Sequence, residues 1–276
     1  MMAISWNSLD AIENARLLSP GAHVIDFGSS NLYHATAAQI EAFVARYATT
    51  IPDNLSELAQ RLEAGSKLGP DGQALNHAFI GEMFEAAGMT YDAIDIADGY
   101  KTTIVDLNFQ ALPEQFIKSA DVVLNFGTSE HILNQANVFK SIHDACKPGG
   151  MIMHQLPAIG FVDHAYYCYT GRFFYDLAAY NEYELLDIWF DGNYTDSEDI
   201  YSSTRAYARY FPHVDKRVAA IGVEDREKRV ASLRIPTVAI NVVLRKVKDK
   251  PFGIMVETST SVGAIPDAVK GAYANG

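Results

Sequence analysis

The sequence has few cysteines and no long apolar run. Only Cys146 and Cys168 occur in 276 residues, and they do not form a CxxC pair, which argues against a disulfide scaffold and favours two reduced thiols. No stretch approaches the roughly 20 apolar residues that a membrane span requires. The first residues also lack the basic and apolar regions of a signal peptide. We therefore expect a cytoplasmic protein that makes no membrane contact.

Basic residues are also scarce. The 22 Lys and Arg side chains are outnumbered by 34 Asp and Glu side chains, giving a net charge of -12. A protein that binds nucleic acid by neutralising phosphates needs the opposite balance, so we expect no nucleic-acid partner. Apolar residues make up 49% of the chain, enough for a sizeable core in one large domain. The oligomeric state is not indicated, and a homodimer is left open.

What the sequence does contain is an alternation of short β-rich runs with helical stretches. This alternation is typical of βαβ units, and it predicts an α/β fold: a Rossmann-like, mostly parallel seven-stranded sheet with helices on both faces. The last two strands follow one another closely, in the manner of an antiparallel edge. The predicted strands cover residues 23–28, 91–96, 102–107, 121–126, 151–156, 183–190 and 238–245.

Helices are predicted between these strands, at residues 5–18, 37–47, 54–63, 74–87, 132–146 and 172–180. We expect residues 1–276 to form a single domain. Helical additions at about 32–88 would fill a crossover twice the minimal length. A polar, tyrosine-rich stretch at about 191–216 is a predicted lid, and about 251–276 a predicted tail.

Polar and acidic residues follow three of the predicted strands. Asp26-Phe27-Gly28-Ser29-Ser30 forms a small-residue turn after the first strand, where backbone N–H groups can approach a ligand. Taken alone, this motif is equally consistent with an ordinary β-turn that binds no ligand. Asp95 ends the second strand, where a carboxylate can accept hydrogen bonds from both ribose hydroxyls. Asp106 ends the third, placed to accept from an adenine amino group. Together these positions predict a nucleoside site.

A fourth segment carries the strongest signal. Asp121-Val122-Val123 begins a strand, Glu130-His131 lies in the turn after it, and a helix leads to Lys147-Pro148-Gly149-Gly150 before the next strand. Over about residues 24–156, this order resembles the class I S-adenosylmethionine-dependent methyltransferases. Asp26-Phe27-Gly28 matches the first motif of that family and Asp95 its ribose-binding acid. A serine, Ser30, stands where the family usually has a second glycine, and the crossover is longer than usual.

The resemblance implies S-adenosylmethionine as cofactor, S-adenosylhomocysteine as product and methyl transfer to a small-molecule acceptor. It implies that the cofactor is lined by Asp26, Gly28, Ser29, Ser30, Asp95, Ile96, Asp106, Leu107, Asn125, Phe126 and Gly127. Asn125 and Phe126 would lie near the methionine end. The acceptor atom is not indicated, because oxygen, nitrogen, sulfur and carbon acceptors all use this fold.

A general base is needed only for an acceptor that must lose a proton, and histidine is the natural choice near neutral pH. His131, His154 and His164 fall after or within strands at the presumed active edge, and His164 has the better placement, in a loop. Each also has a structural interpretation, as a helix cap, a core residue or a surface residue. The histidines lack a metal-ligand spacing such as HExxH, so no metal is expected.

An aromatic cluster follows His164. Rings with polar tips can line a pocket for a flat or cationic acceptor, and the predicted substrate contacts are Tyr166, Tyr169, Phe173 and Tyr194. The same rings could instead pack a helix onto the sheet. The alternative to an enzyme is a Rossmann-like protein that binds a nucleoside or serves as a scaffold without catalysis. A nicotinamide oxidoreductase is disfavoured because GxGxxG is absent.

Overall fold

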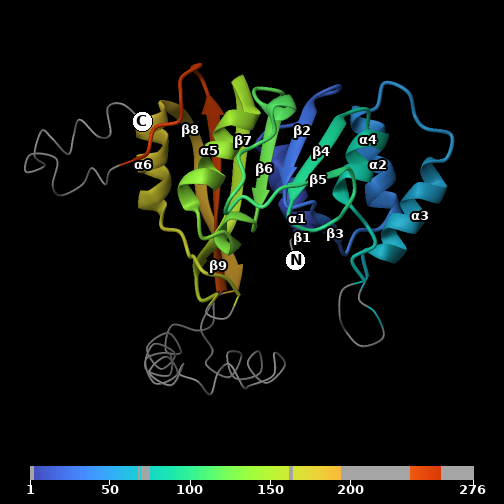
Figure 1. The fold of residues 1–276 in the computed structure, drawn as a ribbon. Helices are drawn as coiled ribbons and strands as arrows, with labels where there is room; N and C mark the ends of the chain where they lie inside the picture. Colours follow the sequence, from blue (N-terminus) through green and yellow to red (C-terminus); the bar gives the residue numbers. More distant parts are fainter. Residues whose placement is uncertain (1–2, 68, 70–74, 162–163, 194–236, 256–276) are drawn as a thin grey trace, which may run out of the picture.

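The computed structural model describes residues 3–67, 69, 75–161, 164–193 and 237–255. Its centre is a seven-stranded sheet in the order β5-β4-β2-β6-β7-β9-β8 (Figure 1). The strands are β2 (His23–Phe27), β4 (Thr90–Asp95), β5 (Thr102–Ile104), β6 (Ala120–Phe126), β7 (Cys146–Ile159), β8 (Tyr183–Asn193) and β9 (Thr237–Lys246).

Neighbouring strands are parallel from β5 to β7, and β9 runs antiparallel to both β7 and β8. The carboxyl ends of the parallel strands therefore lie along one edge, which we call the carboxyl edge. Open α/β sheets bind their ligands at this edge. The predicted fold class, a Rossmann-like and mostly parallel seven-stranded sheet, is confirmed.

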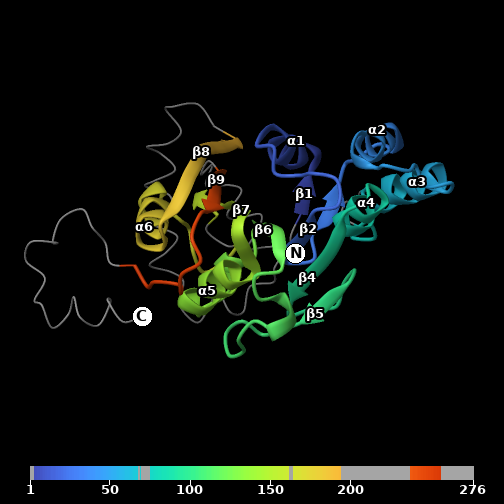
Figure 2. The same cartoon turned by 90° about the horizontal axis from the view of Figure 1, so that it is seen from above.

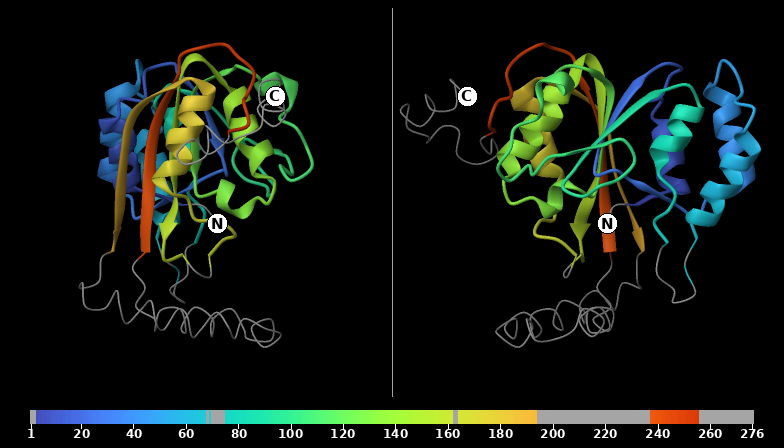
Figure 3. Two further views of the ribbon diagram at one scale, coloured as in Figure 1. Left: turned by 90° about the vertical axis from the view of Figure 1, so that its left-hand side faces the viewer. Right: turned by 45° about the vertical axis from the view of Figure 1, so that its right-hand side comes forward.

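Helices cover both faces of the sheet (Figures 2 and 3). One apolar cluster joins the sheet to four helices, and a second cluster packs two helices against the opposite face. The first group comprises α1 (Trp6–Asn14), α2 (Ala37–Tyr47), α3 (Leu55–Gly65) and α4 (Ile80–Ala86), and the second α5 (Gln135–Ala145) and α6 (Gly171–Asn181). Strands buried on both faces explain the nearly continuous apolar runs in the sequence.

The long crossover between β2 and β4 contains a feature that was not predicted. β3 (Asn31–Tyr33) follows the turn after β2 and pairs in parallel with β1 (Ala3–Ser5), forming a second, two-stranded sheet. The Leu32 amide donates to the Ala78 carbonyl at 2.7 Å, and the Ile80 amide donates to the Ser30 carbonyl at 3.0 Å. Because these backbone groups are bonded to the turn, α4 begins at Ile80 and not near residue 74.

Other element boundaries also differ from the prediction. Ser5 caps α1 by accepting from the Ser8 amide, so it lies outside the helix. The predicted helix at 132–146 begins only at Gln135, after the short 3-10 helix η2 (Ser129–His131). A second 3-10 turn, η1 (Glu114–Phe116), precedes β6. Of the predicted lid only residues 191–193 are described, as the end of β8, and of the tail only 251–255. The rest of both lies outside the described residues.

No helix within the described ranges is long and apolar enough to cross a membrane. Cys146 is buried and Cys168 is exposed, and both are free thiols.

Candidate active site

The turn after β2 is organised around a buried carboxyl group. Asp26 has no exposed surface, and its Oδ2 accepts hydrogen bonds from the Ser30 amide at 2.8 Å and the Tyr91 hydroxyl at 2.9 Å. Burial raises the pKa of Asp26, although both hydrogen bonds oppose that shift. Gly28 and Ser29 have φ angles of 129° and 42°, which turn the chain sharply at the carboxyl edge. Asp26 therefore stabilises the turn from the buried side, by accepting a hydrogen bond from its backbone.

The same turn buries polar atoms that have no partner. Asp26 Oδ1 and the hydroxyls of Ser29 and Ser30 lack a hydrogen-bond partner among the residues that the structure describes. Such atoms are rare in native proteins, and a bound ligand is one way to satisfy them. Space is tight on one side, because a Cβ at Gly99 would lie 2.2 Å from Ser29 Oγ. The turn thus offers unsatisfied donors and acceptors within a close-fitting cradle.

Two further acids lie at the same edge. Asp95 is the last residue of β4 and is half-buried, and its Oδ1 accepts from the Ala97 amide at 3.0 Å. Among the described residues no donor contacts its Oδ2. Ile96 follows with 66% of its surface exposed. Asp106 comes just after β5 and accepts from the Asn108 amide at 2.9 Å, beside the buried Leu107. An acid followed by an apolar side chain thus lies at or just after the end of each of two neighbouring strands at this edge.

The end of β6 is held by a side-chain network. The Asn125 amide donates to Ser129 Oγ at 3.0 Å and to His154 Nδ1 at 2.9 Å. The Thr128 hydroxyl donates to the Phe27 carbonyl, which ties this segment to the turn after β2. Phe126 is buried, and Gly127 has a φ of 73°. The Asn125 side chain is therefore committed to the protein, and only backbone atoms of 125–127 are left for a ligand.

His154 lies in the core and not at the predicted catalytic position. It is 1% exposed and lies 5.5 Å from the Phe139 ring and 5.2 Å from the Phe174 ring, measured between centroids. Burial lowers its pKa to about 3. An imidazole in this position stays neutral at neutral pH and faces side chains, not an acceptor. The structure gives His154 the role of a core histidine.

The structure brings His131 and His164 together beside Glu130, a residue that the sequence did not indicate as a candidate for chemistry. Their rings lie 5.0 Å apart, and their Nε2 atoms lie 4.0 Å and 3.8 Å from Oε1 of Glu130. Burial lowers the pKa of His131. Glu130 is fully buried, yet neither carboxylate oxygen has a hydrogen-bond partner among the described residues. We call these three residues the Glu-His-His cluster.

The predicted aromatic contacts separate into two groups. Tyr169 is buried, and its hydroxyl donates to Gln135 Oε1 at 2.7 Å and lies 3.2 Å from Ser129 Oγ. The Phe173 ring lies tilted against the Phe139 ring, with the centroids 4.8 Å apart. Tyr169, just before α6, and Phe173 on α6 therefore pack against α5, so both have a packing role, which was the structural alternative for these rings. Tyr166 is 68% exposed. Tyr194 lies outside the described residues.

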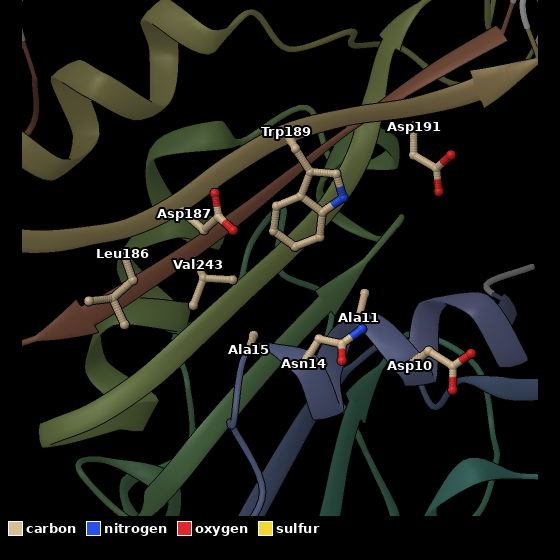
Figure 4. Close-up of a pocket in the computed structure, with 9 residues that line it drawn as sticks. All are labelled: Asp10, Ala11, Asn14, Ala15, Leu186, Asp187, Trp189, Asp191 and Val243. Atoms are coloured by element: carbon tan, nitrogen blue, oxygen red, sulfur yellow. The ribbon is translucent and has the colours of Figure 1, made fainter.

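A groove of about 510 Å³ lies elsewhere, between α1 and the strand β8 (Figure 4). The Trp189 side chain occupies its β8 side, and Asp10 and Asn14 lie on its α1 side. None of the predicted cofactor or catalytic residues lines this groove. We therefore locate the candidate site at the carboxyl edge and not here.

Comparison with known proteins adds a family to this geometry. A family model described as a methyltransferase domain matches residues 33–203, more than half of the chain. The chain belongs to this methyltransferase family. The predicted family is thereby confirmed, and the methyl donor of such methyltransferases is S-adenosylmethionine. No curated protein matches the methyltransferase.

Several solved structures are similar to the chain at low identity. A candidate sarcosine dimethylglycine methyltransferase of Galdieria sulphuraria is 11% identical, with a TM-score of 0.45, and the match covers 86% of this chain and 83% of that one. Phosphoethanolamine N-methyltransferase 2 of Haemonchus contortus, in complex with S-adenosyl-L-methionine, is 15% identical with a TM-score of 0.40, covering 87% and 52%. This methyltransferase thus matches about half the length of the Haemonchus protein.

A methyltransferase of Geobacter sulfurreducens in complex with S-adenosyl-L-homocysteine is 15% identical, with a TM-score of 0.38, and the match covers 86% of this chain and 89% of that one. The family assignment rests on the domain match and not on these structures.

Proposed function

We propose that this methyltransferase transfers the methyl group of S-adenosylmethionine to a small-molecule acceptor at the carboxyl edge of its sheet. The observation that carries the proposal is the convergence of three separate strand ends. The turn at 28–30, Asp95 after β4 and Asp106 after β5 all lie at one edge because β2, β4 and β5 are parallel neighbours. The hydroxyls of Ser29 and Ser30 have no partner among the described residues, and the carboxylates of Asp95 and Asp106 can each accept further hydrogen bonds. These groups match the polar groups of an adenosine.

The residues that would hold the donor are those predicted from the sequence. Gly28, Ser29 and Ser30 offer a close backbone approach and two buried hydroxyls that have no partner in the described part of the chain. Asp95 would bind the ribose hydroxyls, and Ile96 would contact one face of the adenine ring. Asp106 would accept from the adenine amino group, and Leu107 would contact the other face of the ring. Asp26 would hold the turn in place. Residues 125–127 would contact the donor through their backbone atoms. S-adenosylmethionine itself supplies a methyl group on a sulfonium leaving group.

The protein's contribution to the reaction is mainly positioning and the exclusion of water. An acceptor that must lose a proton also needs a base. His164 and His131 are the exposed histidines beside the β6 turn, with 43% and 38% of their side chains exposed. We assign the role of base to His164, with His131 as its neighbour. We retain the expectation that Tyr166, Tyr194 and the segment at about 191–216 cover the acceptor.

The direct test is isothermal titration of the purified protein with S-adenosylmethionine and S-adenosylhomocysteine. We expect binding of both, and Asp95→Ala should weaken binding more than tenfold, because a charge-assisted contact to the ribose is lost. Asp53→Ala is the matched control, since Asp53 is an exposed acid near the start of α3. Absence of binding by the unaltered protein would refute the proposal.

Turnover separates catalysis from binding alone. A protein that binds both compounds but releases no S-adenosylhomocysteine with any small-molecule acceptor would support the non-catalytic alternative. The readout is S-adenosylhomocysteine release across acceptors bearing hydroxyl, amine, thiol and activated carbon groups. We expect release with at least one of these classes.

A further inference from the structure

The carboxylate of Glu130 is buried without a partner, which is an expensive arrangement in a folded protein. Its side chain is 1% exposed, and neither oxygen accepts a hydrogen bond from any residue within the described ranges. Moving an unpaired carboxylate out of water costs several kcal/mol, so buried carboxylates are normally paired or coordinate metals. The nearest candidates for compensation are the imidazoles of His131 and His164.

These imidazoles do not form hydrogen bonds with the carboxylate of Glu130. Oε1 lies 3.8 Å from His164 Nε2 and 4.0 Å from His131 Nε2, whereas hydrogen bonds between such atoms measure about 2.7–3.2 Å. The His131 Nε2 atom is also buried and has no hydrogen-bond partner among the residues described. Three potential ligand atoms, one from each residue, lie within 4.8 Å of one another. The three groups surround a common point without bonding to each other.

Backbone hydrogen bonds hold this arrangement in register. The Glu130 carbonyl accepts from the Tyr166 amide at 3.0 Å and from the Tyr167 amide at 3.3 Å. The Tyr167 hydroxyl also donates to the Leu133 carbonyl at 3.2 Å. The segment that follows β7 is thus fastened to the turn that follows β6. This contact places His164 beside Glu130-His131 although 32 residues separate it from His131 along the chain.

We propose that Glu130, His131 and His164 bind a divalent transition-metal ion. Two imidazole nitrogens and one carboxylate form a donor set that suits zinc and iron, whereas Mg²⁺ and Ca²⁺ prefer oxygen ligands alone. Ligands about 2.0–2.2 Å from a tetrahedral ion lie about 3.3–3.6 Å apart, so each Nε2 atom needs to approach Oε1 by about half an ångström. Both histidines are partly exposed and lie in or beside a turn, so they can make this movement.

The ion would retain open positions for a further ligand. Its three protein ligands leave at least one position unfilled, as in catalytic zinc sites. His164, with 43% of its side chain exposed, is the most exposed of the three ligands, whereas Glu130 and the Nε2 atom of His131 are buried. A coordinated Nε2 cannot accept a proton, so in the metal-bound protein His164 would be a ligand and not the base. A water molecule on the ion, ionised to hydroxide, would then take the acceptor's proton in the proposed methyl transfer, on which this step rests. The metal site itself does not depend on the donor site.

The test uses the full chain without a histidine tag, stripped with a chelator and dialysed. Isothermal titration with Zn²⁺ should show one site per chain, and Co²⁺ should give a visible d–d spectrum at the same stoichiometry. Glu130→Gln keeps the shape of the side chain and removes its charge, and His164→Ala changes a side chain at the surface. Each should weaken Zn²⁺ binding by at least about tenfold.

His77→Ala is the matched control, because His77 is an exposed histidine outside the cluster and should leave binding unchanged. Far-UV circular dichroism checks the fold of every variant, and His164→Ala keeps the test decisive should Glu130→Gln not fold. A loss below tenfold in folded His164→Ala, or an equal loss in His77→Ala, would overturn the site. Titration of the same samples with S-adenosylhomocysteine shows separately whether the donor site is intact.

Discussion

The Asn125 side-chain amide donates a hydrogen bond to Nδ1 of His154 at 2.9 Å, across directly paired positions of β6 and β7. Asn125 also bonds Ser129, so this contact links the buried histidine to the turn that carries Glu130 and His131. Since Nδ1 accepts, the neutral ring carries its proton on Nε2. A single side chain thus connects the core of the sheet with the candidate active site.

The first prediction is a pH dependence of stability that comes from His154. Its pKa in the folded protein is about 3, against about 6.5 in an unfolded chain. Between these values the unfolded chain binds more protons, so the free energy of unfolding increases with pH. Its contribution is complete above about pH 6.5 and declines on acidification, by up to about 1.4 kcal/mol per pH unit. Urea titrations from pH 7.5 to 4.5 measure this slope.

His154→Met serves as the comparison for that slope. Methionine fills a similar volume but cannot be protonated, and Asn125 loses one acceptor, so the variant should be less stable at pH 7. Its free energy of unfolding should nevertheless depend less steeply on pH below 6.5. Parallel curves for the two proteins would show that His154 does not titrate as its burial implies.

A second prediction concerns the support beneath the turn after β2. Tyr91→Phe removes the hydroxyl that donates to Asp26 and leaves a buried carboxyl oxygen with one donor fewer. We expect a loss of about 1.5–3 kcal/mol in the free energy of unfolding, measured with urea. Tyr47→Phe is the control, because Glu13 retains its contact with Arg46 when the Tyr47 hydroxyl is absent. Equal losses in both variants would contradict a special role for the Asp26 contact.

A third prediction tests the tight packing at Gly99. Gly99→Ala would place a Cβ 2.2 Å from Ser29 Oγ, so the turn must shift. Overpacking of this kind costs about 1–3 kcal/mol, and we expect weaker binding of S-adenosylhomocysteine as well as a lower melting temperature.

The closest contact at Gly99 can be removed in a second variant, although Thr102 Oγ1 would still lie 2.9 Å from the added Cβ. Ser29→Gly removes the opposing side chain at a residue whose φ of 42° favours glycine, so the double variant should be more stable than Gly99→Ala alone. Gly171→Ala is the control, with its nearest neighbour at 3.7 Å. A double variant no more stable than Gly99→Ala would show that Ser29 is not the obstacle.

A fourth prediction concerns Lys246, which lies almost fully buried at the end of β9. Its ammonium donates to the carbonyls of His143 and Cys146 at 2.8 Å and 2.9 Å, at the carboxyl end of α5. A cation there bonds carbonyls that have no partner within the helix. Lys246→Met should lower the free energy of unfolding by about 2 kcal/mol. Lys140→Met, an exposed change on α5, should alter it by less than about 0.5 kcal/mol.

The strands of the sheet could be predicted from the sequence because their signal is local. A run such as Asp121-Val122-Val123-Leu124 is apolar, β-rich and bounded by turn residues, and each of the seven predicted strands is present in the sheet. The start of α4 could not be predicted. Residues 78–80 form hydrogen bonds to Ser30 and Leu32, which lie far away along the chain. No local pattern reveals a backbone partner at that separation.

The candidate site divides in the same way. The order of its motifs along the chain, together with parallel strand pairing, determined that the turn at 28–30, Asp95 and Asp106 meet at one edge. The role of each side chain depended on burial and on partners from other elements. His154 and Tyr169 have the residue types of an active site, yet they lie in the core because β7 and the segment just before α6 place their rings against Phe139.

Glu130 shows the reverse case. Adjacent to His131 in the sequence it has the pattern of a helix cap, and only the fold brings His164 to it. The sequence by itself determined the sheet, the family and the edge at which we propose that the donor binds, because these depend on local periodicity and motif order. The tertiary structure decided which histidines face solvent and which carboxylate is left unpaired, because burial and pairing depend on contacts between distant segments.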